Sequence, residues 1–109
     1  MISYFVRYRG SAADPAGFVA YYANRHAAIL KEFPGIRTLS LYEPTVWNDP
    51  FPVNPDGTAL LAQMTFDKPA DLERALHSQA RRRAREDFGR FPAFSGEVTH
   101  QAMSRRIIF

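Results

Sequence analysis

Residues 18–36 read FVAYYANRHAAILKEFPGI and predict an amphipathic helix that ends at Pro34 and Gly35. Side chains four positions apart stack on one face of a helix, so His26 falls on an apolar and aromatic face. The members of this face are Phe18, Tyr22, His26, Ile29, Leu30 and Phe33. The face that should bury against a sheet therefore carries a side chain that can exchange a proton near neutral pH.

A strand is predicted before this helix. Residues 2–9 alternate, with Ile2, Tyr4, Val6 and Tyr8 on one side. Asp14 is a good N-cap and Pro15 suits the first helical position, so we expect the helix to run from there to Phe33.

The segments after the helix complete a repeated pattern. Strands are predicted over residues 36–46, 58–66 and 97–109. Between the last two lies a second helix, capped by Asp67, with an apolar seam formed by Leu72, Leu76, Ala80, Ala84 and Phe88. The order βαββαβ predicts an α+β, ferredoxin-like fold, a four-stranded antiparallel sheet with two helices on one face. The 109 residues suffice for a single domain over residues 1–109.

Both faces of the predicted strands carry apolar side chains. The pairs on opposite faces are Phe5 and Tyr4, Leu61 and Leu60, and Met103 and Ala102. A sheet with one face in water alternates more cleanly between apolar and polar residues. We therefore expect a homodimer in which the face without helices meets a second copy of the chain.

Composition excludes several classes of protein. The chain has no cysteine, which excludes disulfides and thiolate metal sites and fits a reducing cytoplasm, the location that we expect. No apolar run is long enough to cross a membrane, and the start of the chain does not have the pattern of a signal peptide. The three histidines lack the spacing of a metal site.

The net charge of +3 is local. It comes from Arg81, Arg82, Arg83 and Arg85, which we interpret as a solvated helix surface. RNA-recognition modules share the βαββαβ order, but their third strand carries glycines and aromatic residues. The third strand here reads ALLAQMTF, so nucleic acid is not an expected partner.

The stretch with Phe18, Tyr21, Tyr22 and His26, followed by Phe33-Pro34-Gly35-Ile36, resembles the EthD family of the dimeric α/β-barrel superfamily. The third strand that runs into Phe66-Asp67, with a helix opened by Pro69-Ala70, is also similar to that family.

The resemblance implies a dimeric α/β barrel with a cleft between the helices and the sheet of each subunit. It further implies a ring-shaped, largely apolar or aromatic metabolite in that cleft and no bound cofactor. Relatives include methylmuconolactone methylisomerases and small oxygenases of polyketide pathways. This chain differs from the methylisomerases at Leu39, near where they have a tyrosine. Haem-degrading members have an asparagine and a tryptophan near the positions of Arg7 and Phe66, so haem is not expected.

The candidate catalytic residue is His26, which could move a proton between carbon and oxygen of a bound lactone or enol. The candidate ligand-binding residues are Tyr22, Tyr4, Met64 and Trp47, the last as a lid on the loop at residues 47–57. Three of them also have a structural alternative: a satisfied core histidine for His26, simple packing for Tyr22, and a loop or dimer contact for Trp47. Arg7, Arg9 and Arg37 could neutralise a ligand carboxylate, and the sequence leaves open which of them points inward. No role is assigned to His77 or His100.

Two classes of function remain open. The first is a cofactor-free enzyme or enzyme accessory. Its reaction would be either a proton transfer, as in an isomerase or a lyase, or a cofactor-independent oxidation in catabolism. The second is a non-catalytic ligand-binding or regulatory subunit.

Overall fold

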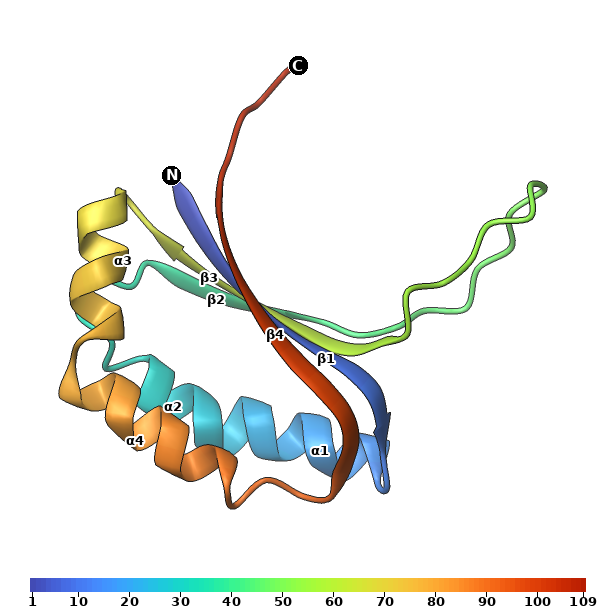
Figure 1. Ribbon diagram of the computed structural model, residues 1–109, viewed down its shortest axis with the longest axis horizontal. Helices are drawn as coiled ribbons and strands as arrows, with labels where there is room; N and C mark the ends of the chain where they lie inside the picture. The colour runs from blue at the N-terminus through green and yellow to red at the C-terminus, as the bar shows by residue number, and fades with distance from the viewer.

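Alternating strands build one antiparallel sheet in the order β2-β3-β1-β4 in the computed structural model, which describes residues 1–109 (Figure 1). The strands are β1 (Ile2–Ala12), β2 (Thr38–Tyr42), β3 (Thr58–Phe66) and β4 (Phe94–Ser104). The central β1 pairs with β3 on one side and with β4 on the other. The predicted fold class is confirmed, and β3 has the predicted bounds.

The register of the sheet places the apolar residues of β1 and β3 on the same face. Opposite residues in this register are Ile2 and Phe66, Tyr4 and Met64, Val6 and Ala62, and Tyr8 and Leu60. All eight are buried. The helices cover one face of the sheet (Figure 1). These strand residues lie on that face, because they form one buried cluster with Phe18, Tyr22 and Leu30 of the helix layer.

The first helical segment contains a wide turn. It comprises α1 (Pro15–Tyr21), the π-helical η1 (Tyr22–His26) and α2 (Ala27–Leu30) without interruption. The Asp14 carboxylate accepts a hydrogen bond from the backbone N–H of Gly17 at 3.1 Å, which confirms it as the N-cap. The helix is one turn shorter than predicted, because it ends at Leu30.

The second predicted helix is two helices, α3 (Pro69–Leu76) and α4 (Gln79–Phe88). Ser78 separates them, because its hydroxyl accepts a hydrogen bond from the backbone N–H of Arg81 and so starts a new helix. The prediction that Asp67 caps the helix is wrong. Its carboxylate is bound by the guanidinium of Arg37 instead, and Lys68 occupies the N-cap position.

Three strands differ from the prediction in their bounds. β1 continues to Ala12 because residues 10–12 pair with residues 94–96, which also starts β4 early. The edge strand β2 ends at Tyr42, before Pro44, whose nitrogen cannot donate to a sheet. β4 ends at Ser104, and the side chains of residues 107–109 are exposed.

The opposite face of the sheet has no helix over it (Figure 1). Phe5 and Leu61 are half-buried on this face, and Met103 is 55% exposed there. None of the helices is long and apolar enough to span a bilayer.

Candidate functional site

A cavity of about 250 Å³ lies between the helices and the sheet. Most of its lining is apolar or aromatic, which suits a small ring-shaped ligand. The lining residues are Tyr4, Val6, Tyr8, Tyr22, His26, Leu30, Phe33, Met64, Arg81, Ala84, Arg85, Phe88, Val98 and His100.

His26 ends the π-helical segment η1 and makes a buried hydrogen bond to α4. Its Nδ1 lies 2.9 Å from Oδ2 of Asp87, and both residues are only 6% exposed. The second carboxylate oxygen, Oδ1, accepts a hydrogen bond from the hydroxyl of Tyr21 at 2.8 Å. A contact between two helices therefore fixes the orientation of the imidazole ring.

Burial and hydrogen bonding together determine the charges of this pair. Burial lowers the pKa of His26 below its ordinary value of 6.5, although Asp87 partly opposes the shift. Burial alone would raise the pKa of Asp87, but the hydrogen bonds from His26 and Tyr21 outweigh it and lower that pKa. At neutral pH the charged carboxylate of Asp87 thus accepts a hydrogen bond from Nδ1–H of a neutral His26, whose Nε2 carries no proton.

The unprotonated Nε2 opens onto the cavity. It makes no hydrogen bond within the chain, and no buried side-chain nitrogen or oxygen is left without a partner. Nε2 is therefore accessible, and the accessible space beside His26 is the cavity that it lines. This geometry presents a free base to a bound molecule.

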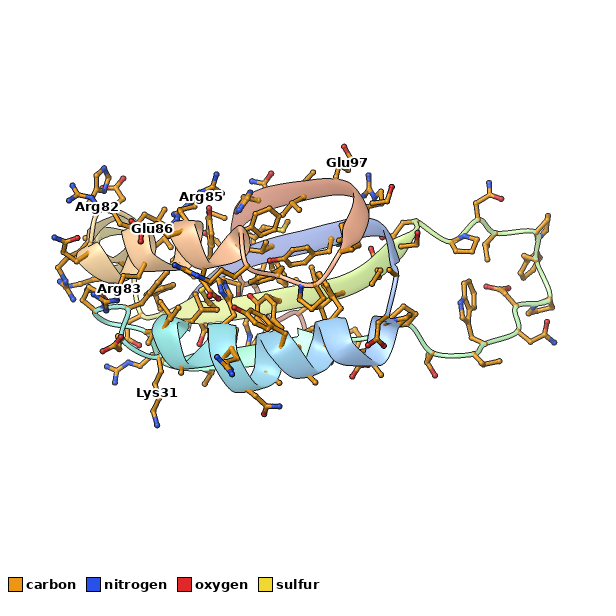
Figure 2. All side chains as sticks on the ribbon, turned by 90° about the horizontal axis from the view of Figure 1, so that it is seen from below. Lys31, Arg82, Arg83, Arg85, Glu86 and Glu97 are labelled. Atoms are coloured by element: carbon orange, nitrogen blue, oxygen red, sulfur yellow. The ribbon has the colours of Figure 1, made fainter.

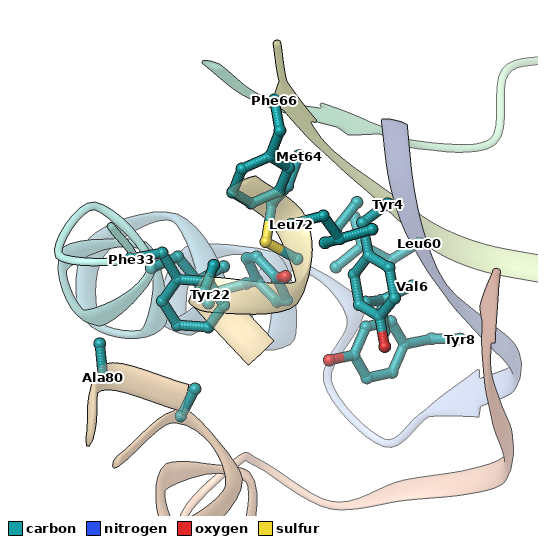
Figure 3. Close-up of a cluster of buried hydrophobic side chains, with 14 of the residues drawn as sticks. Tyr4, Val6, Tyr8, Tyr22, Phe33, Leu60, Met64, Phe66, Leu72 and Ala80 are labelled. Carbon is teal, nitrogen blue, oxygen red and sulfur yellow. The ribbon is translucent and has the colours of Figure 1, made fainter. Parts of the chain in front are cut away.

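The hydroxyl groups of three tyrosines are also free to bind a ligand in the cavity. Tyr4, Tyr8 and Tyr22 are buried, yet their hydroxyls make no hydrogen bond within the chain and are not sealed from the cavity. Figure 3 shows Tyr4 and Tyr8 reaching from β1 toward the helix layer. Burial raises the pKa of both Tyr8 and Tyr22, so these groups stay protonated and can donate a hydrogen bond to a ligand oxygen.

Aromatic rings hold the imidazole from two sides. The ring of Phe91 lies edge-on at 4.7 Å from the His26 ring, and Tyr22 lies edge-on at 4.9 Å. Phe91 also contacts the rings of Tyr8 and Phe18. The ring of His26 therefore has little freedom to turn away from Asp87.

The structure brings together four of the predicted site residues, His26, Tyr22, Tyr4 and Met64, around one cavity. Trp47 is not among them. The prediction that it covers the ligand cavity is wrong, because Trp47 does not line the cavity of the chain to which it belongs. It is 55% exposed on the long segment 43–57, which extends away from the helices (Figure 2). Trp47 lines a separate open hollow with Arg7 and Tyr42, on the face of the sheet opposite the helices.

Sequence reasoning missed Asp87 and the position of two arginines at the cavity. Arg81 and Arg85 line the cavity, which the interpretation as a solvated helix surface did not foresee. Arg85 is nevertheless exposed, as expected, whereas Arg81 is half-buried. Arg82 and Arg83 are exposed, as predicted. His100, which received no role, also lines the cavity, with its ring 5.9 Å from that of Tyr4.

The arginines that could have neutralised a ligand carboxylate, and His77, lie outside the cavity. Arg7, Arg9 and Arg37 pair with Asp56, Glu97 and Asp67, respectively. His77 Nδ1 lies 2.7 Å from the backbone carbonyl oxygen of Glu73. No group of three or more histidine, aspartate or glutamate side chains is placed to hold a metal ion.

The sequence profile described as the EthD domain matches residues 11–95. The chain belongs to the EthD family. No functionally curated protein matches this EthD chain. The family match confirms the resemblance that the stretch around His26 indicated.

Solved structures share the fold of this EthD protein at low sequence identity. An EthD family protein from Bacillus halodurans C-125 is 17% identical with a TM-score of 0.71, covering 97% of this chain and 100% of the other. SnoaB, a cofactor-independent oxygenase from Streptomyces nogalater, is 17% identical with a TM-score of 0.64, and the match covers 97% of this chain and 93% of SnoaB. The monooxygenase ActVA-Orf6 of Streptomyces coelicolor, in complex with nanaomycin D, is 16% identical with a TM-score of 0.70. This match covers 99% of this chain and 89% of the monooxygenase.

Proposed function

We propose that this EthD protein is a cofactor-free enzyme that binds a small ring-shaped, largely apolar metabolite and transfers a proton through His26. The observation that carries this proposal is the free Nε2 of a neutral imidazole that opens onto an apolar cavity while Asp87 holds Nδ1. A histidine with only a structural role needs no such access, because its polar atoms are satisfied within the core.

The proposed step is removal of a proton from an O–H group, or from a C–H group beside a carbonyl, of the bound metabolite. Nε2 accepts the proton, and the carboxylate of Asp87 stabilises the imidazolium that forms. The hydroxyls of Tyr8 and Tyr22 can donate hydrogen bonds to the oxygen on which negative charge develops. A base of this kind contributes about 10²–10⁴-fold to a rate.

The same step begins two of the reaction types that the sequence left open. Return of the proton to another atom completes an isomerisation, whereas reaction of the enolate with dioxygen begins an oxidation. The oxygenase and the monooxygenase that share this fold support oxidative catabolism of an aromatic metabolite as the more specific form of the proposal.

We also propose that the chain forms a homodimer through the sheet face that lacks helices. Phe5, Leu61 and Met103 give this face an apolar component that a monomer leaves partly in water. A second sheet packed on this face would bury these side chains without covering the cavity, which lies on the opposite side.

The decisive experiment captures ligands from a cell extract by native mass spectrometry and then assays turnover of each compound found. We expect a ring compound that the wild type converts and that His26→Gln binds but converts at least 100-fold more slowly. His77→Gln is the matched control, because His77 is exposed outside the cavity.

Equal turnover in His26→Gln and the wild type would overturn the proposed role of His26. A captured compound that the wild type retains unchanged would instead identify a ligand-binding or regulatory subunit.

A further inference from the structure

The cavity that holds His26 also carries an uncompensated positive charge. Arg81 and Arg85 lie one turn apart on α4, and both line the cavity. None of the residues that line the cavity is acidic, because Asp87 lies behind His26. His100 on β4 lies in the same lining, across the cavity from α4.

Neither arginine is neutralised by an acidic side chain of the protein. Arg81 and Arg85 form no ion pair and donate no side-chain hydrogen bond within the chain, whereas Arg83 on the same helix binds Glu32 at 2.8 Å. Figure 2 shows Arg83 on the side of α4 that faces α2, and Arg85 on the other side. The charges at 81 and 85 are therefore free to bind a ligand.

Both arginines are close to aromatic side chains of the cavity. The guanidinium carbon of Arg81 lies 5.9 Å from the centre of the Tyr4 ring. Burial raises the pKa of Tyr8, and the charge of Arg85 partly opposes that shift, so this charge acts inside the cavity. Burial also lowers the pKa of His100, with Arg81 and Arg85 adding to the effect.

Exposure increases along the cavity. His26 and Tyr22 are buried, Arg81 is half-buried, and Arg85 and His100 are exposed. The free base therefore lies at the inner end of the cavity and the arginines lie at its solvent end. A ligand that reaches both ends needs an apolar ring at one end and a negative group at the other.

We propose that Arg81, Arg85 and His100 form an anion-binding subsite that selects ring metabolites bearing an acidic group, a carboxylate or an acidic enol, over neutral ones. Guanidinium groups bind such anions through charge-assisted hydrogen bonds, and the neutral imidazole of His100 can donate another. This inference rests on the ligand cavity of the proposed function, but it does not depend on the proton transfer.

The test compares two probes of equal shape, 2-naphthoate and the neutral 2-naphthamide, by isothermal titration calorimetry. We expect the wild type to bind the carboxylate about 10- to 100-fold more tightly, the value of one or two charge-assisted contacts. Added salt should weaken binding of 2-naphthoate alone. The double variant Arg81→Gln/Arg85→Gln should lose this preference, and the control Arg83→Gln should keep it.

Perturbation of the His26 imidazole resonances by both probes places their rings in the cavity, and circular dichroism checks that each variant folds. Equal affinity of the wild type for the two probes, with His26 perturbed by both, would overturn the anion subsite and leave the proposed function intact. A preference that survives in the double variant would also overturn the subsite. Failure of both probes to bind would count against the ligand cavity itself, and so against both proposals.

Discussion

Asp87 Oδ2 lies 2.9 Å from His26 Nδ1, although the two residues are 61 positions apart in the chain. The contact joins η1 to α4, and the hydroxyl of Tyr21 completes the hydrogen bonding of the carboxylate. Because Asp87 accepts a hydrogen bond from Nδ1–H, the tautomer of His26 and the availability of Nε2 both depend on a residue of another helix.

Asp87→Asn tests whether this carboxylate sets the base strength of His26. Asparagine retains an acceptor for Nδ1–H but removes the negative charge. In the wild type this charge raises the pKa of His26 and so opposes the effect of burial. We expect the pKa of His26, followed by NMR titration, to fall further in this variant. Turnover of a captured substrate should also fall, because the imidazolium loses its counter-charge.

Asp87→Ala is the companion variant. It leaves Nδ1 without an acceptor in a buried position, so the free energy of unfolding should fall by about 1–3 kcal/mol, whereas Asp87→Asn should lose less. An unchanged His26 pKa in Asp87→Asn would show that Asp87 has only a structural role.

Stability should decrease in mildly acidic solution because of His26. Its pKa in the folded chain lies below the ordinary 6.5, so below pH 6.5 the unfolded chain binds more protons. The contribution of His26 to stability is therefore complete above pH 6.5 and is lost as the pH falls toward the folded-state pKa. We expect the free energy of unfolding, measured with urea from pH 7.5 to 5, to fall less steeply in His26→Gln.

A residual slope is expected in that variant, because the pKa of His100 is also lowered and acts in the same direction. Parallel curves for His26→Gln and the wild type would contradict the buried, neutral state of His26.

Gly10 and Gly96 face each other across β1 and β4, with φ angles of 139° and 147° that other residues rarely adopt. A Cβ atom at position 10 would also collide with the carbonyl oxygen of Ser95. We expect Gly10→Ala to lower the free energy of unfolding by at least about 1–3 kcal/mol.

Gly89→Ala is the control for this substitution. Gly89 has a helical φ of −67°, and the nearest atom to a new Cβ would lie 3.4 Å away. Chemical denaturation should give it wild-type or slightly higher stability. Equal stability losses in the two variants would show that the close approach of β1 and β4 is not the cause.

Met103→Glu tests the proposed dimer. It introduces a charge on the helix-free face of the sheet at a side chain that is already 55% exposed in one chain, so folding of the subunit should be unaffected. Light scattering should show a dimer for the wild type and a monomer for this variant. Arg82→Glu, exposed on α4, should remain dimeric. A wild-type chain that is monomeric at micromolar concentration would reject the dimer.

Local periodicity was sufficient to predict four residues of the cavity, His26, Tyr22, Tyr4 and Met64. Spacing by four along the helix placed Tyr22 and His26 together, and spacing by two placed Tyr4 and Met64 each on one apolar side of its strand. Pairing then brought Tyr4 opposite Met64 in adjacent strands. These positions were accessible to prediction because each depends on the repeat of a single helix or strand.

The hydrogen-bond partner of His26 could not be predicted from periodicity, because the contact depends on how two helices pack against each other. Asp87 occurs in RRRAREDFGR, a highly charged stretch that is typical of an exposed helix surface. One signal was present, since Asp87 follows Ala84 by three positions and Ala80 by seven, the spacing of a buried helical face. Trp47 had no such signal, because the path of a long loop is not fixed by a repeat.

The π-helical turn explains why His26 could be found by counting in fours. In a regular α-helix each residue advances by about 100°, so Leu30, twelve positions after Phe18, would point about 120° away from it. The wider turn at Tyr22–His26 takes up part of this angular drift, and Phe18, Tyr22, His26 and Leu30 are all buried. Loss of one residue from this turn would rotate everything downstream about the helix axis. The number of residues in the turn, and not only their identity, thus keeps both halves of the helix directed at the sheet.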